Sequence, residues 1–387
     1  MSIPTVSVII PVFNRSTVLD RSVGSALRQT GIAVEVIAID DGSCDASVAM
    51  LEALAAAYPD TVLVILRHSE NLGQAVARNT GMAIATGRYM AFLDSDDAFG
   101  SVHTLAQWIA QAERLDAEIL VARSAEVLAN DTQKAAPLWR LTNSADAPYT
   151  PLAVSTTPDV VAVRNFWQCL YLKSFLDGNA VTFSPRLKQR EDRLFMLQSF
   201  FAADRIFFTN QITHLRYRDQ ENSTMNDRSI EQLEMFIQHI HELALTVQVM
   251  RRADRSNPDF EMINAFQYYK SCTQYWRATL LRCFRRGRRD LVLRLAQGLT
   301  LLADGLPEFA SHPRFDASES ARVDLVRLVL AHEKLGLFKM LLKKKEPDAD
   351  QLEGLCVTHK QVVQRYLNST RIEDPSNRRP SPDGAGL

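Results

Sequence analysis

Three carboxylates follow an apolar run in the stretch YMAFLDSDDAFG, residues 89–100. Asp94, Asp96 and Asp97 stand within four positions of one another, so their negative charges repel. A loop tolerates such repulsion when water solvates each acid, and a bound divalent cation also relieves it. The spacing favours a cation among these side chains, and a solvated acidic loop is the alternative.

The elements that must position these acids alternate between strands and helices. Apolar runs rich in β-branched residues predict strands at 6–12, 34–39, 62–66, 89–93 and 118–121. Helical patterns lie between them, at 16–29, 46–58, 73–86 and 104–115. Strands that alternate with helices of this length predict a parallel sheet with helices on both faces.

Ligands bind such sheets beyond the carboxyl ends of the strands, so the residues that follow each strand should share one cleft. Acidic residues follow three of the four strands between residues 6 and 93, at Asp40 and Asp41, at Glu70, and at Asp94–Asp97. A cleft this acidic repels phosphates unless a metal ion bridges them.

The rest of the chain has a different character. A stretch rich in Pro, Thr, Ser and Ala at 135–159 predicts a loop, and amphipathic helical patterns begin at Ile230. We therefore predict an α/β domain at 1–226, a helical domain at 227–371 and a disordered tail at 372–387.

Bulk properties restrict the protein class and its location. A formal net charge of −1 argues against a nucleic-acid-binding chain. Five dispersed cysteines without CxxC spacing favour reduced thiols, and the N-terminus lacks the features of a secretory signal. No run of apolar residues is long enough to span a bilayer. These features predict a cytoplasmic protein whose only membrane contact would be peripheral, at the inner face of the cell membrane.

Seven motifs in order carry a resemblance: VSVIIPVFNR, AIDDGSCDAS, NLGQAVARNTG, FLDSDDAF, FWQCLYLKSFL, REDRLF and YRDQENST. Together they resemble a family 2 glycosyltransferase over residues 5–226. The resemblance implies the GT-A fold, a Rossmann-like mixed sheet sandwiched by helices, here followed by a mainly α-helical C-terminal region. It also implies a nucleotide-diphosphate sugar donor.

The resemblance assigns roles to two acids of the 94–97 stretch, Asp96 and Asp94. Asp96 matches the family's metal-contacting acid, with Mn²⁺ or Mg²⁺ as the ion. Asp94 is implied as a second metal ligand or as a partner of the donor's ribose or sugar hydroxyls. Asp97 has an alternative role as the N-cap of the following helix.

The donor site follows from the same resemblance. Asp41 matches the acid that accepts a hydrogen bond from the nucleotide base, and DDGS is also a favourable turn sequence. Phe13 would stack on the base or pack in the core. Arg78 and Asn79 would reach the phosphates or fix the acidic loop, with a surface arginine as the alternative. The donor-binding set comprises Pro11, Val12, Phe13, Asn14, Asp41, Asn71, Gly73, Arg78, Asn79, Asp94 and Ser95.

Glu191 and Asp192 resemble the family's acidic dipeptide, whose second residue is the general base. Asp192 would remove the acceptor's hydroxyl proton on the face opposite the leaving nucleotide, as inverting transfer requires. An exposed helix start would also favour two acids. His214, Arg216 and Arg218 would contact diphosphate or acceptor, or line a strand with alternating cations.

These assignments predict an inverting, metal-dependent enzyme that moves a sugar to a hydroxyl of a glycan, a lipid-linked acceptor or a cell-surface polysaccharide. The chain lacks the Q-x-x-R-W sequence of processive relatives, so single addition is favoured. Two alternatives stay open. One is a DxD phosphohydrolase, and the other is a non-catalytic nucleotide-sugar-binding protein.

Basic residues border apolar positions in the C-terminal region. They are Arg282, Arg285, Arg286, Arg288, Arg289, Arg294, Lys339, Lys343, Lys344 and Lys345. Such helices contact anionic lipid in some proteins, and in others they form a bundle with solvated basic ends. The bundle is the favoured interpretation.

Overall fold

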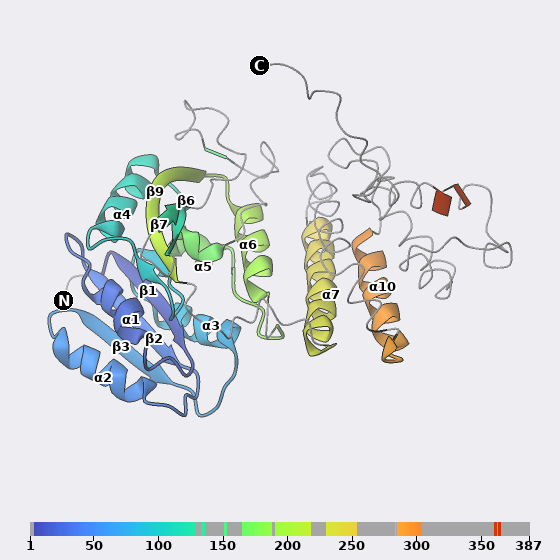
Figure 1. Ribbon diagram of the computed structural model, residues 1–387. Helices are drawn as coiled ribbons and strands as arrows, with labels where there is room; N and C mark the ends of the chain where they lie inside the picture. Colours follow the sequence, from blue (N-terminus) through green and yellow to red (C-terminus); the bar gives the residue numbers. More distant parts are fainter. Residues whose placement is uncertain are drawn as a thin grey trace, which may run out of the picture. The chain divides into compact units, whose positions relative to one another are not determined.

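The computed structural model describes residues 4–127, 133–135, 151–152, 165–187, 190–217, 230–253, 283, 285–303, 360–361 and 363–364. The chain divides into two compact units, Met1–Asn226 and Asp227–Leu387 (Figure 1).

The first unit is built on a mixed sheet with strand order β3-β2-β1-β4-β8-β6-β9-β5, and β7 pairs with β6. Its strands are β1 Val6–Val12, β2 Val34–Asp40, β3 Val62–Arg67, β4 Tyr89–Phe92, β5 Ala98–Phe99, β6 Ile119–Val127, β7 Gln133–Ala135, β8 Cys169–Leu172 and β9 Ile206–Tyr217. Its α-helices are α1 Leu19–Leu27, α2 Ser47–Ala57, α3 Gln74–Ile84, α4 Thr104–Leu115, α5 Lys173–Gly178 and α6 Glu191–Ala202.

The first four predicted strands are confirmed, and they pair in parallel as β3, β2, β1 and β4. The fifth predicted strand lies at the start of β6, which runs antiparallel to β8 and parallel to β9. The sheet is therefore mixed, as the GT-A fold requires.

Pro11 marks the place where the sheet opens. It aligns with Ile39 of β2, whereas β1 pairs with β4 only from Val6 to Ile9. Proline has no N–H to donate, so a strand accepts it where a neighbouring strand has already ended. The chain after β4 leaves the sheet at this point and forms a turn at residues 94–97, called the acidic turn below.

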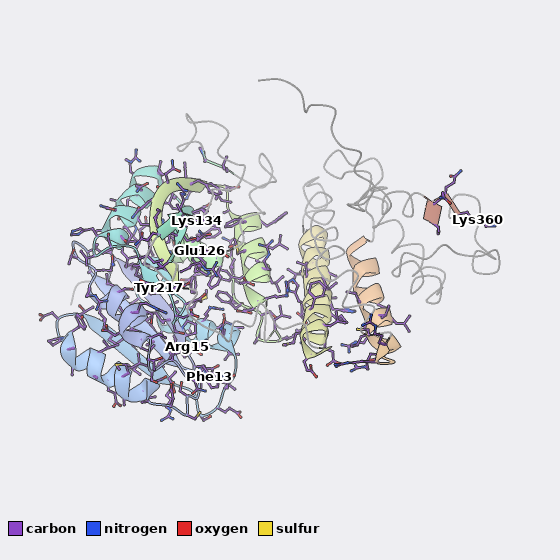
Figure 2. All side chains as sticks on the ribbon, in the orientation of Figure 1. Phe13, Arg15, Glu126, Lys134, Tyr217 and Lys360 are labelled. Carbon is purple, nitrogen blue, oxygen red and sulfur yellow. The ribbon has the colours of Figure 1, made fainter. Side chains whose placement is uncertain are left out.

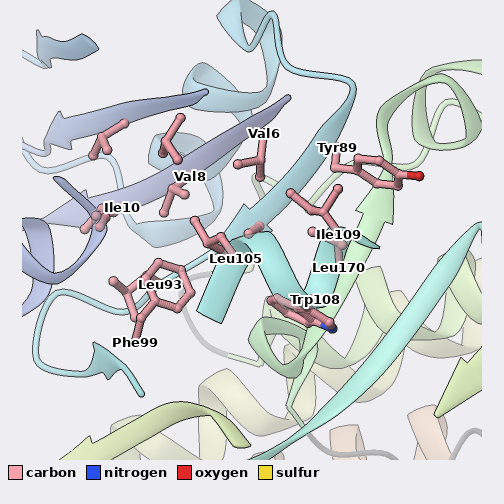
Figure 3. Packing of buried hydrophobic residues seen from close by; sticks show 14 of the residues in the cluster. Val6, Val8, Ile10, Tyr89, Leu93, Phe99, Leu105, Trp108, Ile109 and Leu170 are labelled. Atoms are coloured by element: carbon pink, nitrogen blue, oxygen red, sulfur yellow. The ribbon is translucent and has the colours of Figure 1, made fainter. Parts of the chain in front are cut away.

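Helices cover both faces of the sheet. Val6, Val8 and Ile10 of β1 point to the face where Leu105 and Trp108 of α4 pack (Figure 3). On the opposite face α3 approaches closely. A Cβ built on Gly81 would lie 2.7 Å from Ile9 Cγ2 and 2.8 Å from Ile39 Cδ1.

An aromatic cluster brings α6 to the same face as α3. Phe183 stacks on Phe195 of α6 with ring centroids 4.0 Å apart, and Phe92 of β4 meets Phe195 edge-on at 5.7 Å. Because Phe92 aligns with Ile9 in the sheet, these rings lie beside α3. This packing places the N-terminus of α6 near the end of β4.

The second unit contains α7 Ile230–Ala253 and α10 Arg289–Ala303 (Figure 1). Leu233, Phe236, Ile237, Ile240 and Leu243 of α7 are buried, which confirms the predicted apolar face for these members. A Cβ on Gly298 of α10 would lie 2.9 Å from Ile240 Cγ2, so the two helices approach closely.

The basic segment takes part in this pair of helices. Arg288 contacts Glu234 of α7 at 2.6 Å and Asp290 at 2.9 Å, while Leu291, Val292 and Leu295 of α10 are buried. The predicted lysine run at 339–345 lies outside the described residues. Within the described part of the chain, no helix is long and apolar enough to cross a membrane.

Candidate active site

The turns after β1 and β2 are joined to each other. The Asp41 N–H donates to Val12 O at 2.8 Å, and the Asn14 N–H donates to Ser43 Oγ at 2.9 Å. Asn14 has a φ of 52°, and its Oδ1 accepts from the Cys44 N–H at 2.9 Å. This joint leaves Phe13 42% exposed at the end of β1 (Figure 2), so its alternative role in the core is wrong.

Asp41 organises the loop between β3 and α3. Its Oδ1 accepts from the Leu72 N–H at 3.0 Å and its Oδ2 from the Gly73 N–H at 2.8 Å. His68 Nδ1 lies 2.7 Å from the same Oδ1. The Asp41 side chain is buried, and Leu72 beside it is 44% exposed. The exposed Phe13 and Leu72 side chains therefore belong to segments that flank the carboxylate.

Gly42 is required where this loop meets the DDGS turn. Its φ is +75°, and a Cβ there would lie 2.6 Å from the Glu70 carbonyl carbon. Only glycine allows that approach without moving the backbone of the loop. The DDGS sequence thus forms a turn, and the loop that carries Asn71 and Gly73 packs against it at Gly42.

Arg78 of α3 joins the acidic turn to α6. Its guanidinium contacts Glu191 Oε1 at 2.5 Å and Asp94 Oδ1 at 3.0 Å, and it is 2% exposed. Gln74 Oε1 accepts from the same guanidinium at 3.0 Å, and the Phe166 ring lies beneath it with its centroid 4.6 Å away. Burial lowers the pKa of Arg78, but the charges of Glu191 and Asp94 more than offset this and raise it overall. Arg78 is therefore a buried charged residue, and the surface alternative is wrong.

Asn79 connects α3 to the segment before α6. Its Nδ2 donates to Phe183 O at 2.8 Å, and its Oδ1 accepts from the Phe183 N–H at 2.9 Å. Both polar atoms of the Asn79 amide are thus hydrogen-bonded to the backbone of Phe183. The structure gives Asn79 a positioning role, and a contact between Asn79 and a donor phosphate stays a prediction.

The acidic turn closes with a hydrogen bond from the Asp97 N–H to Asp94 O at 3.1 Å. Asp97 Oδ1 accepts from the Tyr217 N–H of β9 at 3.2 Å, and α4 begins only at Thr104. The alternative in which Asp97 caps that helix is therefore wrong. Burial, followed by the charges of Asp94 and Asp96, raises the pKa of Asp97 to about 8.

The acidic dipeptide forms the first turn of α6. Arg190 before it has a φ of 63°, and the Arg193 N–H donates to Asp192 Oδ1 at 2.8 Å. Glu191 is buried against Arg78, so the alternative of an exposed helix start is wrong for this residue. Burial raises the pKa of the Asp192 carboxyl, although the charges of Arg193 and Arg78 oppose the rise.

Residues 7–177 match the sequence profile described as Glycosyl transferase family 2. The N-terminal unit is a family 2 glycosyltransferase domain. The predicted resemblance is confirmed.

Curated relatives agree over parts of the chain. The chain is 30% identical over 220 residues to the uncharacterized glycosyltransferase YibD of Escherichia coli, covering 54% of this chain and 60% of the relative. It is 37% identical over 119 residues to the succinoglycan biosynthesis protein ExoO of Rhizobium meliloti, covering 31% and 33%. It is 28% identical over 204 residues to the poly(ribitol-phosphate) beta-glucosyltransferase of Bacillus spizizenii, covering 52% and 30%. The chain thus spans at most 60% of the length of these relatives.

Solved structures confirm the fold class. The structure of S. aureus TarS 1–349 in complex with UDP-GlcNAc has a TM-score of 0.64 and 17% sequence identity. The match covers 95% of this chain and 90% of that chain. At this identity the likeness establishes the GT-A-type fold and nothing finer.

The acidic turn of this glycosyltransferase domain contains carboxylates of the type that bind divalent cations. Burial, followed by the charge of Asp94, raises the pKa of the Asp96 carboxyl. Two carboxylates completed by diphosphate oxygens are a usual ligand set for Mg²⁺. Among the described residues, no group of three or more His, Cys, Asp or Glu side chains is arranged to hold a metal ion. The donor's own oxygens would therefore have to supply further ligands.

His214 lies inside the glycosyltransferase domain, next to the end of β4. It is fully buried, with Phe99, Trp108 and Trp167 around its ring, and its Nε2 lies 3.2 Å from Phe92 O. Burial lowers the pKa of His214 to about 4. The prediction that His214 contacts diphosphate or acceptor is wrong, because the ring lies inside the domain. Arg216 lies 4.0 Å from Glu126, and Arg218 lies outside the described residues.

Sequence reasoning assigned no role to His68, Gln74 or Thr80. His68 follows β3 directly, so its place at a strand end was a usable signal. Gln74 and Thr80 lie on α3, and helical periodicity does not show which distant side chains they meet.

Proposed function

We propose that the N-terminal unit is an inverting, non-processive glycosyltransferase. It moves a sugar from a nucleotide-diphosphate donor, a UDP-sugar, to a hydroxyl of a glycan. One observation carries this proposal: Arg78 contacts Glu191 and Asp94 together, so the acidic turn and the base-bearing helix α6 meet at one buried cation. A donor-binding module alone has no need of that connection.

The donor's nucleotide would bind at the ends of β1 and β2. Phe13 and Leu72 present exposed apolar surface there, and Asp41 lies buried between their segments as a hydrogen-bond acceptor. Pro11, Val12, Asn14 and Asn71 would complete this part of the site. An apolar surface with one fixed acceptor suits a planar base that carries a ring N–H.

The diphosphate would lie over the acidic turn. Asp96 and Asp94 would hold Mn²⁺ or Mg²⁺, which when bound neutralises negative charge on the departing diphosphate. Ser95 and Gly73 would lie near the same group. The ion is required because Asp94 and Asp96 alone would repel the donor's phosphates.

Asp192 would act as the general base. The acceptor hydroxyl oxygen forms a bond to the anomeric carbon while the bond from that carbon to the diphosphate breaks, and the hydroxyl proton passes to the Asp192 carboxylate. A carboxylate whose pKa burial raises is a stronger base than an exposed one. Glu191 fixes the start of α6 through Arg78 and is a positioning residue.

The acceptor class is inferred from the relatives. Among the relatives, one is a succinoglycan biosynthesis protein and another is a poly(ribitol-phosphate) beta-glucosyltransferase. We infer that the acceptor is a lipid-linked or cell-surface polysaccharide, which the enzyme would meet at the inner face of the cell membrane.

A panel of nucleotide-sugars tests the proposal. The full chain is incubated with UDP-, GDP- and dTDP-sugars, with Mn²⁺ or with a chelator, and the released products are identified by NMR. Slow metal-dependent release of UDP and of sugar with inverted anomeric configuration is expected. Release of inorganic phosphate would favour the phosphohydrolase, and binding without any release would favour the non-catalytic protein.

A further inference from the structure

His68 is held at three points between β2 and α3. Its backbone N–H donates to Asp40 O at 2.8 Å. Its Nδ1 lies 2.7 Å from Asp41 Oδ1, and its Nε2 lies 3.1 Å from Thr80 Oγ1. The side chain is only 11% exposed, so the ring has little freedom to turn.

The partners fix the position of the imidazole proton. An ionised carboxylate only accepts hydrogen bonds, so Nδ1 carries the hydrogen that faces Asp41. In the neutral ring Nε2 is then an acceptor, and the Thr80 hydroxyl donates to it. The Thr80 hydroxyl on α3, which can donate or accept, thereby completes the hydrogen bonding of the tautomer that Asp41 selects.

These contacts leave one hydrogen-bond acceptor position of the Asp41 carboxylate unused. A carboxylate offers about four acceptor positions. His68 and Leu72 use two at Oδ1, and Gly73 uses one at Oδ2. By this count the unused position is on Oδ2, and the segments next to this carboxylate carry the exposed side chains of Phe13 and Leu72.

A single fixed acceptor distinguishes between nucleobases. Uracil, thymine and guanine present a ring N–H on their pairing edge, whereas cytosine and adenine present a ring lone pair there. A lone pair facing a carboxylate is repelled, and it also leaves the buried acceptor without a donor.

We propose that His68, held by Thr80, is a specificity-determining positioning residue that makes Asp41 select donors whose base carries a ring N–H. This inference rests on the proposed function, because it concerns the same donor site. The imidazole occupies Oδ1 and prevents the carboxylate from rotating, so only Oδ2 is offered to the base.

The test compares UDP with CDP, which differ on the pairing edge of the base. Dissociation constants of both are measured by calorimetry on the full chain with Mn²⁺, for the wild type and for Thr80→Val, Thr80→Ser and His68→Ala. Valine has the shape of threonine without its hydroxyl, and serine retains the hydroxyl. Melting temperatures check that each variant folds. If His68→Ala does not fold, Thr80→Val alone provides the test.

The wild type should prefer UDP. Thr80→Val and His68→Ala should reduce the UDP-to-CDP preference by about tenfold, the factor expected for one buried hydrogen bond, while Thr80→Ser retains it. With a UDP-sugar, the same variants should raise KM and leave kcat near its wild-type value.

An unchanged preference in Thr80→Val would overturn this inference and leave the proposed function intact. A wild-type chain that binds neither nucleotide would overturn both.

Discussion

The carboxylates after β2 and after β4 lie at the same edge of the sheet, yet their surroundings differ. Asp41 after β2 is buried and accepts from two backbone N–H groups and one imidazole. After β4, Arg78 contacts Asp94 and Arg21 donates to Asp96 O at 2.7 Å, while burial and the neighbouring acids raise the pKa values of Asp96 and Asp97. The first site has its hydrogen-bond partners within the protein, whereas in the second, burial and the neighbouring acids disfavour the charged forms of Asp96 and Asp97.

This difference corresponds to the two parts of a nucleotide-sugar donor, the base and the diphosphate. A base is recognised through directional hydrogen bonds, so the acceptor in the protein must already have a fixed orientation before the donor binds. A diphosphate is recognised by charge, and carboxylates grouped in one turn are the type of ligand that would bind the cation accompanying it. We infer that the β2 end is preorganised, while the β4 end gains its stability when the metal and the donor bind.

Asp192→Asn should have the largest effect on activity. It removes the proposed general base and leaves the carboxylates after β2 and after β4 in place. Loss of a general base lowers turnover by about 10²- to 10⁴-fold. Steady-state release of UDP from the preferred donor measures this, and calorimetry should give a UDP affinity within about twofold of wild type, since the proposed base would face the acceptor and not the nucleotide. Asp177→Asn, an exposed acid on α5, is the control. Turnover within tenfold of wild type would contradict the role.

Arg78→Met tests whether the buried cation joins the two halves of the site. The change leaves Glu191 and Asp94 without their partner, and such a loss in a buried pair costs about 3–5 kcal/mol of unfolding free energy. Urea unfolding of the full chain measures it. The exposed pair Arg88 and Glu113 at 2.8 Å is the matched control, and Arg88→Met should cost less than about 1 kcal/mol. Equal losses in the two variants would refute the distinction.

His214 supports the β4 end as a neutral ring, which makes stability depend on pH. Its pKa is about 4 in the folded protein against 6.5 in the unfolded chain, so the unfolded chain takes up the proton first as pH falls. The stabilisation is complete above pH 6.5 and is lost as pH falls toward about 4, by roughly 3 kcal/mol in total. Unfolding free energies of wild type and His214→Gln between these pH values measure the effect. Parallel curves would show that the ring is not buried as a neutral group.

Asp96→Asn should give the smallest change in stability and the clearest loss of metal response. Removing one charge from the crowded turn should raise the stability of the metal-free protein slightly, by less than about 1 kcal/mol. The Mn²⁺-dependent rise in melting temperature at fixed UDP concentration should disappear. Asp60→Asn, at an exposed position between α2 and β3, should retain that rise. A retained metal response in Asp96→Asn would move the metal site elsewhere.

Local pattern was sufficient for much of this domain. The apolar runs predicted β1 to β4, and the strand-end rule pointed to Asp41 and the acidic turn, because side-chain alternation and strand termination depend on near neighbours in the sequence. Pro11 and Gly42 are also local, since each permits a backbone geometry that few other residues allow.

The partners of those residues depend on the folded arrangement. Arg78 meets Glu191 across 113 positions of sequence, and Asn79 meets Phe183 across 104. His214 matched a possible phosphate ligand by residue type, but the aromatic rings around it make it part of the core. A periodic pattern states which face of a helix is apolar, whereas its contacts are set by sheet order and by the packing of α3 and α6 on one face, which no short segment encodes.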